Sequence, residues 1–321
     1  MLTRRQLFPL AAATAAAFAL PGILRARAAA SEFRIGWQKN GVLALAKRTG
    51  ALEKRLADKG VAVTWAEFTS GPPLLEALGA AALDFGPTGD VPPLFAQAAG
   101  GNLVYVATTK GAVDGSAILV KQDSPIKTLA DLKGKNLAFK RGSSAHNFVV
   151  KALRSAGLTP DDVTQLDLPP PDAAAAFAND SIDAWAIWDP YYAIAQKNPD
   201  TRVLASTKGI VDSWSFFFAN GDFAKTNPEI VADVIDELGK VGKWSQSHLD
   251  ETAAALSEIT GVPLDAQKVA LGREGTDLGN LHPLTEEALT YQQSLADEFY
   301  GLKIIPKQLT IRDIVWYPPN T

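Results

Sequence analysis

Apolar and polar positions follow two different periods along this chain, and each period predicts a different kind of element. Short runs such as residues 61–68 and 103–108 are rich in Val and aromatic side chains, which is typical of buried strands. Longer segments such as residues 144–156 and 228–247 repeat their apolar positions every three or four residues, which is typical of amphipathic helices. Because the two kinds alternate, the chain is expected to be α/β with mostly parallel sheets.

The order of these elements predicts two lobes. Strands expected over 33–38, 61–68, 83–86 and 103–108 form a first set, and the apolar run 117–120 leads away from it. A second set has strands over 137–139, 163–168 and 184–187, after which residues 213–219 read as a returning strand. Long helices follow over 228–247, 251–260, 263–272 and 285–301. We therefore assign 31–118 and 214–321 to lobe 1 and 119–213 to an inserted lobe 2, with two crossings and a central cleft where a ligand would bind.

The first thirty residues are organised like an export signal. Arg4 and Arg5 precede an Ala-rich apolar run over 7–24, the segment 26–30 offers A-x-A cleavage sites, and no acidic residue occurs. The adjacent arginines resemble a twin-arginine motif, although Gln6 and Leu7 follow them, and an ordinary secretory signal is the alternative. We predict that residues 1–30 are a signal peptide and that the mature chain is periplasmic.

The net charge and the residue types that are absent exclude several classes of function. Removing the four arginines of the signal leaves 27 basic and 35 acidic side chains, a net charge of 27 − 35 = −8. Such a surface argues against nucleic acid or an anionic membrane as partner. The chain has no cysteine, its three histidines are widely spaced, and it has neither a G-x-S-x-G elbow nor a P-loop. These absences predict no metal, no cofactor and no catalytic activity.

Residues 84–93 predict one place where an anion could bind. They read as a short strand, a glycine-bearing turn and a helix opened by Pro92 and Pro93, a usual position for proline. Free N–H groups at a helix N-terminus attract anions, so Thr88 and Gly89 are predicted to contact a ligand. Asp90 is a preferred N-cap residue, and a purely structural turn is the alternative.

Residues 140–146 predict a second and better anion cradle. Ser143 or Ser144 can cap the following helix, which leaves the other hydroxyl and the free N–H groups for a tetrahedral anion. Lys140 and Arg141 add positive charge. His146, in the first helical turn, is a candidate contact, and a packing histidine is the alternative.

Aromatic residues are predicted to complete the cleft. Trp188 ends a strand just before Asp189, where an indole offers an apolar wall and one N–H donor, whereas Trp185 is expected in the core. Trp37 and Trp214 end or begin strands that could face the same cleft. Gln38, next to Trp37, could donate to an anionic head.

Together these segments resemble the periplasmic substrate-binding proteins of aliphatic sulfonate ABC importers, which are relatives of the taurine and nitrate binders. The resemblance is carried by residues 36–39, 65–68, 84–93, 95–100, 124–127, 131–135, 142–146, 183–191 and 313–316. It implies a type II periplasmic-binding-protein fold that closes around a sulfonate. It also implies ligand contacts at Gln38, Thr88, Gly89, Asp90, Ser143, Ser144, His146, Trp188 and Asp189, to which we add Trp214 and Arg273 as candidates.

One segment departs from the family pattern. Near Arg273 the family tends to show an Arg, an aromatic-Gly pair and a Pro, whereas residues 273–283 here read REGTDLGNLHP. The aromatic residue is missing and the loop is longer, which leaves the size and polarity of the tail pocket open.

We expect a monomeric receptor that captures an organosulfonate for the membrane permease of an ABC importer. Three alternatives stay open: a binder of another small anion such as taurine, nitrate or a sulfate ester, a protein like those of thiamine-pyrimidine synthesis, and a sensor without transport.

Overall fold

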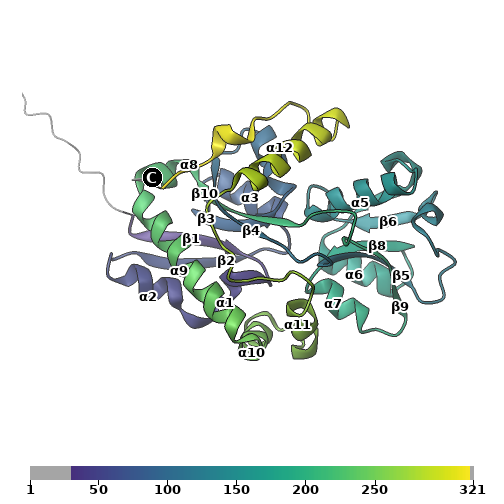
Figure 1. Ribbon diagram of the computed structural model, residues 1–321, viewed down its shortest axis with the longest axis horizontal. Coiled ribbons are helices and arrows are strands. Elements are labelled where there is room, and N and C mark those ends of the chain that lie inside the picture. Colours follow the sequence, from purple (N-terminus) through teal and green to yellow (C-terminus); the bar gives the residue numbers. More distant parts are fainter. Residues whose placement is uncertain (1–29, 319–321) are drawn as a thin grey trace, which may run out of the picture.

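The computed structural model describes residues 30–318 as two α/β lobes side by side (Figure 1). Except for its last residue, the predicted signal peptide lies outside the described residues. The first sheet has the order β2-β1-β3-β10-β4, with β1 (Glu32–Trp37), β2 (Ala62–Glu67), β3 (Phe85–Gly89), β4 (Leu103–Lys110) and β10 (Trp214–Asn220). The second has the order β7-β6-β8-β5-β9, with β5 (Ser116–Lys121), β6 (Asn136–Phe139), β7 (Thr164–Asp167), β8 (Ala184–Trp188) and β9 (Thr201–Ser206).

Each sheet contains one antiparallel strand among parallel ones. β10 runs antiparallel to β3 and β4, and β5 runs antiparallel to β8 and β9, while β1, β2 and β3 are parallel, as are β6, β7 and β8. The predicted α/β class with mostly parallel sheets is confirmed.

Lobe 1 is a sheet covered by helices on both faces. Those that cover it are α1 (Gly41–Thr49), α2 (Ala51–Ala57), α3 (Gly71–Gly79), α4 (Pro92–Ala98), α8 (Gly221–Thr226), α9 (Pro228–Ser247) and α12 (Glu286–Gly301), and α10 (Leu249–Thr260) packs outside them on α1 and α9. The central strand β10 shows why: Phe216 and Phe218 pack with α12, whereas Phe217 and Ala219 belong to the cluster on the α9 face. This period of two places apolar side chains on both faces of the strand.

Lobe 2 repeats this plan with fewer helices. α5 (Ser144–Ser155) covers one face, and α6 (Pro170–Ala178) with α7 (Tyr191–Gln196) covers the other. Along β8, Ala184 and Ala186 face α5, whereas Trp185 and Ile187 face α6. Trp185 is 3% exposed, so its predicted place in the core is confirmed. Short 3-10 helices lie at Leu129–Leu132 and Pro160–Asp162 in lobe 2, and a third lies at Ile311–Ile314 in lobe 1.

The chain crosses between the lobes at residues 111–115 and 207–213. The predicted boundary after residue 118 cuts through β5. Every residue of this strand pairs with β8 or β9 of the second sheet. The apolar run 117–120 therefore belongs to lobe 2, and the glycine-bearing segment before it is the link. The return strand begins at Trp214, the residue at which the predicted second boundary lies.

The C-terminal helices also connect the lobes. α11 (Leu264–Leu271) packs against α7 of lobe 2, where Ala193 is buried with Val262 and Ala266. Figure 1 shows α11 between α10 and α7. Across residues 30–318, none of the helices is both long and apolar enough to cross a bilayer.

Candidate functional site

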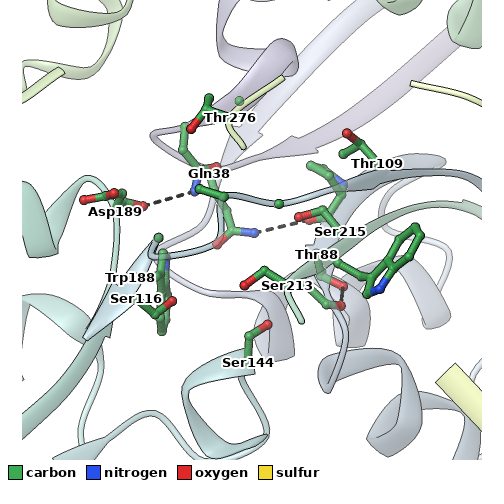
Figure 2. A pocket seen from close by; sticks show the side chains of 18 of the residues that line it. Gln38, Thr88, Thr109, Ser116, Ser144, Trp188, Asp189, Ser213, Ser215 and Thr276 are labelled. Atoms are coloured by element: carbon green, nitrogen blue, oxygen red, sulfur yellow. Dashed lines mark hydrogen bonds between the residues drawn. The ribbon is translucent and has the colours of Figure 1, made fainter. Parts of the chain in front are cut away.

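A cavity of about 310 Å³ lies between the lobes (Figure 2). Its walls come from the carboxyl ends of β1 and β3 in lobe 1, the carboxyl end of β8 in lobe 2, both crossings and the N-terminus of α5. Carboxyl ends of parallel strands are the usual place for a ligand in α/β folds. Nine of the eleven predicted site residues line this cavity: Gln38, Thr88, Gly89, Asp90, Ser143, Ser144, Trp188, Asp189 and Trp214.

The two predicted anion segments face each other across the cleft. A Cβ atom added to Gly89 at the end of β3 would lie 1.9 Å from Ser144 Oγ on α5. A side chain at residue 89 would force the Ser144 hydroxyl to rotate away and would press on Ser144 Cβ, which would lie 3.1 Å from the added atom, so glycine suits this approach. The contact places the Ser144 hydroxyl of lobe 2 directly against the backbone of lobe 1.

The N-terminus of α4 offers less than the sequence suggested. Pro92 and Pro93 open the helix as predicted, but proline has no N–H, and the next amide, that of Leu94, donates to Val91 O at 3.0 Å. The two prolines that mark the start of α4 therefore also leave this helix without free N–H donors for an anion. The segment contributes Thr88 and Gly89 to the cavity wall rather than a helix N-terminus.

Asp90 is not the N-cap of α4, so this alternative interpretation was wrong. Val91 occupies that position, and Asp90 is 2% exposed. Its Oδ2 accepts hydrogen bonds from Tyr291 Oη at 2.7 Å and from Asn147 Nδ2 at 2.8 Å. Because Asn147 belongs to α5, the carboxylate joins the lobes. Burial raises the pKa of Asp90, and the bonds from Tyr291, Ser144 and Asn147 partly oppose this.

The N-terminus of α5 is the stronger anion cradle. Ser143 stands at the N-cap position, but its hydroxyl donates to Lys140 O at 2.6 Å instead of capping the helix. The His146 N–H donates to Ser143 O at 2.9 Å, as the Leu94 N–H does in α4, but α5 begins with Ser144 and Ala145 in place of prolines, so the N–H groups of these two residues remain for a ligand. Lys140 is paired with Asp167 at 2.9 Å, which compensates its charge.

His146 does not line the cavity, and its predicted ligand contact is not supported. The side chain is 3% exposed, Nδ1 accepts the Gly142 N–H at 3.3 Å, and the ring packs among Phe95, Phe139 and Phe299. Burial, with a smaller contribution from Arg141, lowers the pKa of His146 to about 4. It is the packing histidine of the alternative interpretation.

Arg273 also lies outside the cavity lining, because its guanidinium is occupied by lobe 2. The side chain is 6% exposed. Its Nε lies 2.7 Å and its Nη2 3.3 Å from the two carboxylate oxygens of Asp189, Nη2 also donates to Gln196, and Cζ lies 3.8 Å from the Tyr192 ring centroid. Burial raises the pKa of Asp189, and the Arg273 cation opposes this. The pair holds the Trp188–Asp189 wall against lobe 1.

The aromatic walls are partly as predicted. Trp188 and Trp214 line the cavity, and Trp214 stacks on Phe216 with ring centroids 6.5 Å apart. Trp37, predicted to face the cleft, is buried in the core of lobe 1 instead. Gln38 lines the cavity and donates one amide N–H to Pro87 O at 3.2 Å, which leaves its other amide N–H for a ligand.

Hydroxyl groups in and beside the crossings were missed by the sequence interpretation. Thr109, Ser116, Ser213 and Ser215 line the cavity, and Figure 2 shows them with Ser144 and Thr88. The segment 111–116, to which no role was assigned, forms part of the wall. Its position between the two predicted lobes was the available signal, since a crossing chain must border the cleft.

The chemistry of the lining is that of neutral donors. Hydroxyl and amide groups dominate the polar wall, while the Lys110 ammonium lies 2.9 Å from Glu287. Within residues 30–318, no three His, Cys, Asp or Glu side chains gather as a metal site would require. The arrangement can hold an anion by hydrogen bonds.

Comparison with known proteins identifies the family. The model of the family described as "NMT1/THI5 like" matches residues 56–248. The chain belongs to this family. A relative from Escherichia coli (strain K12), named "Putative aliphatic sulfonates-binding protein", is 40% identical over 286 residues, 89% of this chain and 88% of the relative.

Solved structures agree with this assignment. The alkanesulfonate-binding protein SsuA from Xanthomonas axonopodis pv. citri, bound to MOPS, superposes with a TM-score of 0.85 at 37% identity, over 90% of this chain and 99% of that chain. The resemblance to aliphatic sulfonate-binding proteins and the periplasmic-binding-protein fold are thereby confirmed. The desulfurization enzyme DSZB matches at 16% identity with a TM-score of 0.66, over 89% of this chain and 96% of that one, and shows a shared fold alone.

Proposed function

We propose that this protein captures an organosulfonate anion in the periplasm and delivers it to the membrane permease of an ABC importer. The observation that carries the proposal is the junction of Gly89 with Ser144, where the N-terminus of α5 in lobe 2 meets the end of β3 in lobe 1 at one end of the cavity. An anion bound there would touch both lobes at once. The names of the relatives support a sulfonate as that anion.

A sulfonate suits this donor set for a physical reason. It stays ionised at ordinary pH and presents three oxygens, so fixed N–H and O–H donors suffice and no titrating partner is needed. Two of the carboxylates that border the cavity accept hydrogen bonds from protein donors, Asp90 from Asn147 and Tyr291, and Asp189 from Arg273. These bonds reduce the repulsion that free carboxylates would exert on an anion.

We infer capture without chemistry. The buried His146 lies outside the lining, so the serines of the cavity have no histidine base beside them. A monomer fits this role, because both walls of the cavity come from one chain. Residues 1–30 are proposed to act as the signal peptide that brings the chain to the periplasm.

Calorimetry of the mature protein tests the proposal. We expect binding of alkane- or arylsulfonates and weaker or no binding of nitrate, sulfate and neutral heterocycles. Ser144→Asp places a negative charge at the junction and is expected to abolish binding, whereas Ser181→Asp, on an exposed position of lobe 2, leaves it unchanged. Binding of nitrate but of no sulfonate would contradict the proposed ligand, and full affinity of Ser144→Asp would contradict the proposed position.

A further inference from the structure

One face of the helix α5 is turned toward lobe 1. Its residues are Ser144, Asn147, Lys151 and Arg154, spaced three, four and three positions apart, so they form one stripe along the helix. We propose that this stripe is an interlobe latch, in which Asp90 of lobe 1 and Asn147 of lobe 2 are positioning residues that set the anion cradle of α5 against β3. The inference goes beyond the proposed ligand, because the latch acts through protein contacts and would serve any anion.

The buried centre of the latch is a hydrogen bond between the lobes. Asn147 Nδ2 donates to Asp90 Oδ2 at 2.8 Å. Both side chains are buried, and Asn147 lies outside the cavity lining. A hydrogen bond to a carboxylate in such an environment is stronger than one made in water, because little solvent screens it. Separation of the lobes would break this bond, so the bond favours the closed arrangement.

Lobe 1 holds the Asp90 side of the latch in place by itself. Tyr291 Oη donates to Asp90 Oδ2 at 2.7 Å, and Gln292 Nε2 donates to Asp90 O at 2.6 Å. Both donors belong to α12, and Gln292 Nε2 also lies 2.9 Å from the Tyr105 hydroxyl. The carboxylate is therefore oriented before Asn147 reaches it, which lowers the entropic cost of forming the interlobe bond.

The latch and the anion cradle are coupled because they share one helix. Ser144 lies one turn before Asn147 on α5, and Gly89 directly precedes Asp90 in lobe 1. Two neighbouring residues of lobe 1 thus meet two residues on one face of α5. The Asn147–Asp90 bond forms where Ser144 reaches Gly89, so it sets the position of the free N–H groups at the start of α5.

Ion pairs continue the latch toward the solvent. Arg154 Nη1 lies 2.6 Å from one carboxylate oxygen of Glu298 on α12, and Lys151 Nζ lies 3.9 Å from the other. The Lys151 ammonium is also 6.0 Å from the Tyr291 ring centroid. Partly exposed pairs of this kind stabilise little, because water screens them. The buried bond at Asp90 therefore contributes most of the stabilisation.

Exchanging the two partners tests the latch. Asn147→Asp places a second carboxylate opposite Asp90, and the repulsion is expected to separate the lobes. Adding Asp90→Asn restores one amide and one carboxylate with their places exchanged. Tyr291, which donates to Asp90 and accepts from Asn147 at 3.1 Å, can serve either arrangement. We expect this double variant to recover the lobe spacing of the unaltered protein, whereas a side chain needed only for folding would not be rescued by the exchange.

The lobe spacing can be measured directly because the chain contains no cysteine. Lys225→Cys in lobe 1 and Ser181→Cys in lobe 2 provide two exposed sites for spin labels. Pulsed electron paramagnetic resonance in weakly alkaline buffer, which keeps the carboxylates ionised, gives the distribution of distances between the labels. The mature protein is measured without anion and with MOPS, the molecule bound to the relative from Xanthomonas axonopodis. We expect Asn147→Asp to show longer distances and to need roughly tenfold more MOPS to shorten them.

Two further variants complete the test. Asn220→Ala is the matched control, because the hydrogen bonds of that buried asparagine lie within lobe 1, and it should lower thermal stability without changing the label distances. Asn147→Leu removes the donor without adding a charge and should also lengthen the distances. Unchanged distances in both variants of Asn147, or no recovery in the double variant, would contradict the latch. If the variants differ as expected although MOPS changes nothing, the latch stands and the proposed function is contradicted.

Discussion

The buried His146 makes the free energy of unfolding of the protein depend on pH. Its pKa of about 4 in the folded protein lies below the ordinary value of 6.5, because the ring is buried among three phenylalanines. The folded state therefore disfavours protonation. The stabilising contribution of the neutral ring is fully present above pH 6.5 and is lost as the pH falls toward 4.

The magnitude follows from the difference between the two pKa values. At about 1.4 kcal/mol for each pH unit, a difference of roughly 2.5 units gives about 3 kcal/mol in total, of which about 2 kcal/mol is lost at pH 5. His146→Asn removes the titrating group and keeps an oxygen that can accept the Gly142 N–H. We expect the variant to be less stable at pH 7.5 but to lose about 2 kcal/mol less than the unaltered protein on acidification to pH 5.

Urea unfolding followed by tryptophan fluorescence at pH 7.5, 6.5, 5.5 and 5.0 measures this difference. Carboxylates also titrate in acid, but they are the same in both proteins, so the comparison isolates the histidine. His248→Asn, which changes a histidine beside the exposed Trp244, is the control and should keep the full pH dependence. Equal losses of stability in His146→Asn and the unaltered protein would refute the burial argument.

Two further predictions concern the contacts between the lobes. Gly89→Ala puts a Cβ atom 1.9 Å from Ser144 Oγ, so we expect calorimetry to show roughly tenfold weaker anion binding. In a Ser144→Gly background the clash is absent, so adding Gly89→Ala should change the anion affinity little. Arg273→Gln leaves the Asp189 carboxylate buried without its cation, which lowers the free energy of unfolding by about 3–5 kcal/mol. Because this pair holds the lobes together, small-angle X-ray scattering should show a larger radius of gyration for the variant. Lys208→Gln breaks only an exposed ion pair and should leave the radius of gyration unchanged.

The fold was largely predictable because its signals are local. The run of three phenylalanines at Phe216–Phe218 needs two apolar faces wherever it folds, and the helix over residues 228–247 carries its own periodicity. The lobe boundary at residue 118 failed for the opposite reason. The residues within 117–120 are equally apolar whichever of the two sheets they join, so their sequence does not indicate which sheet they pair with.

The site was less predictable because it depends on partners far away in sequence. Asp90 is a preferred N-cap residue by type, but its burial depends on Asn147 and Tyr291. His146 occupies a ligand-like position in a first helical turn, but Phe95 and Phe299, both from lobe 1 and far away in sequence, close the apolar pocket around it. The local sequence pattern was enough to predict which segments border the cleft. Which side chains reach a ligand depends on tertiary contacts that the local pattern does not contain.

The position of β10 between β3 and β4 has a consequence for how the chain is made. The strands of lobe 2 are continuous in sequence, so its sheet can be complete as soon as β9 has been synthesised. The sheet of lobe 1 cannot, because β3 and β4 each pair with a strand that comes only after the whole of lobe 2. Until then, both strands keep an open edge, which is prone to wrong pairing. The topology therefore favours a folding order in which the inserted lobe comes first and the enclosing lobe last.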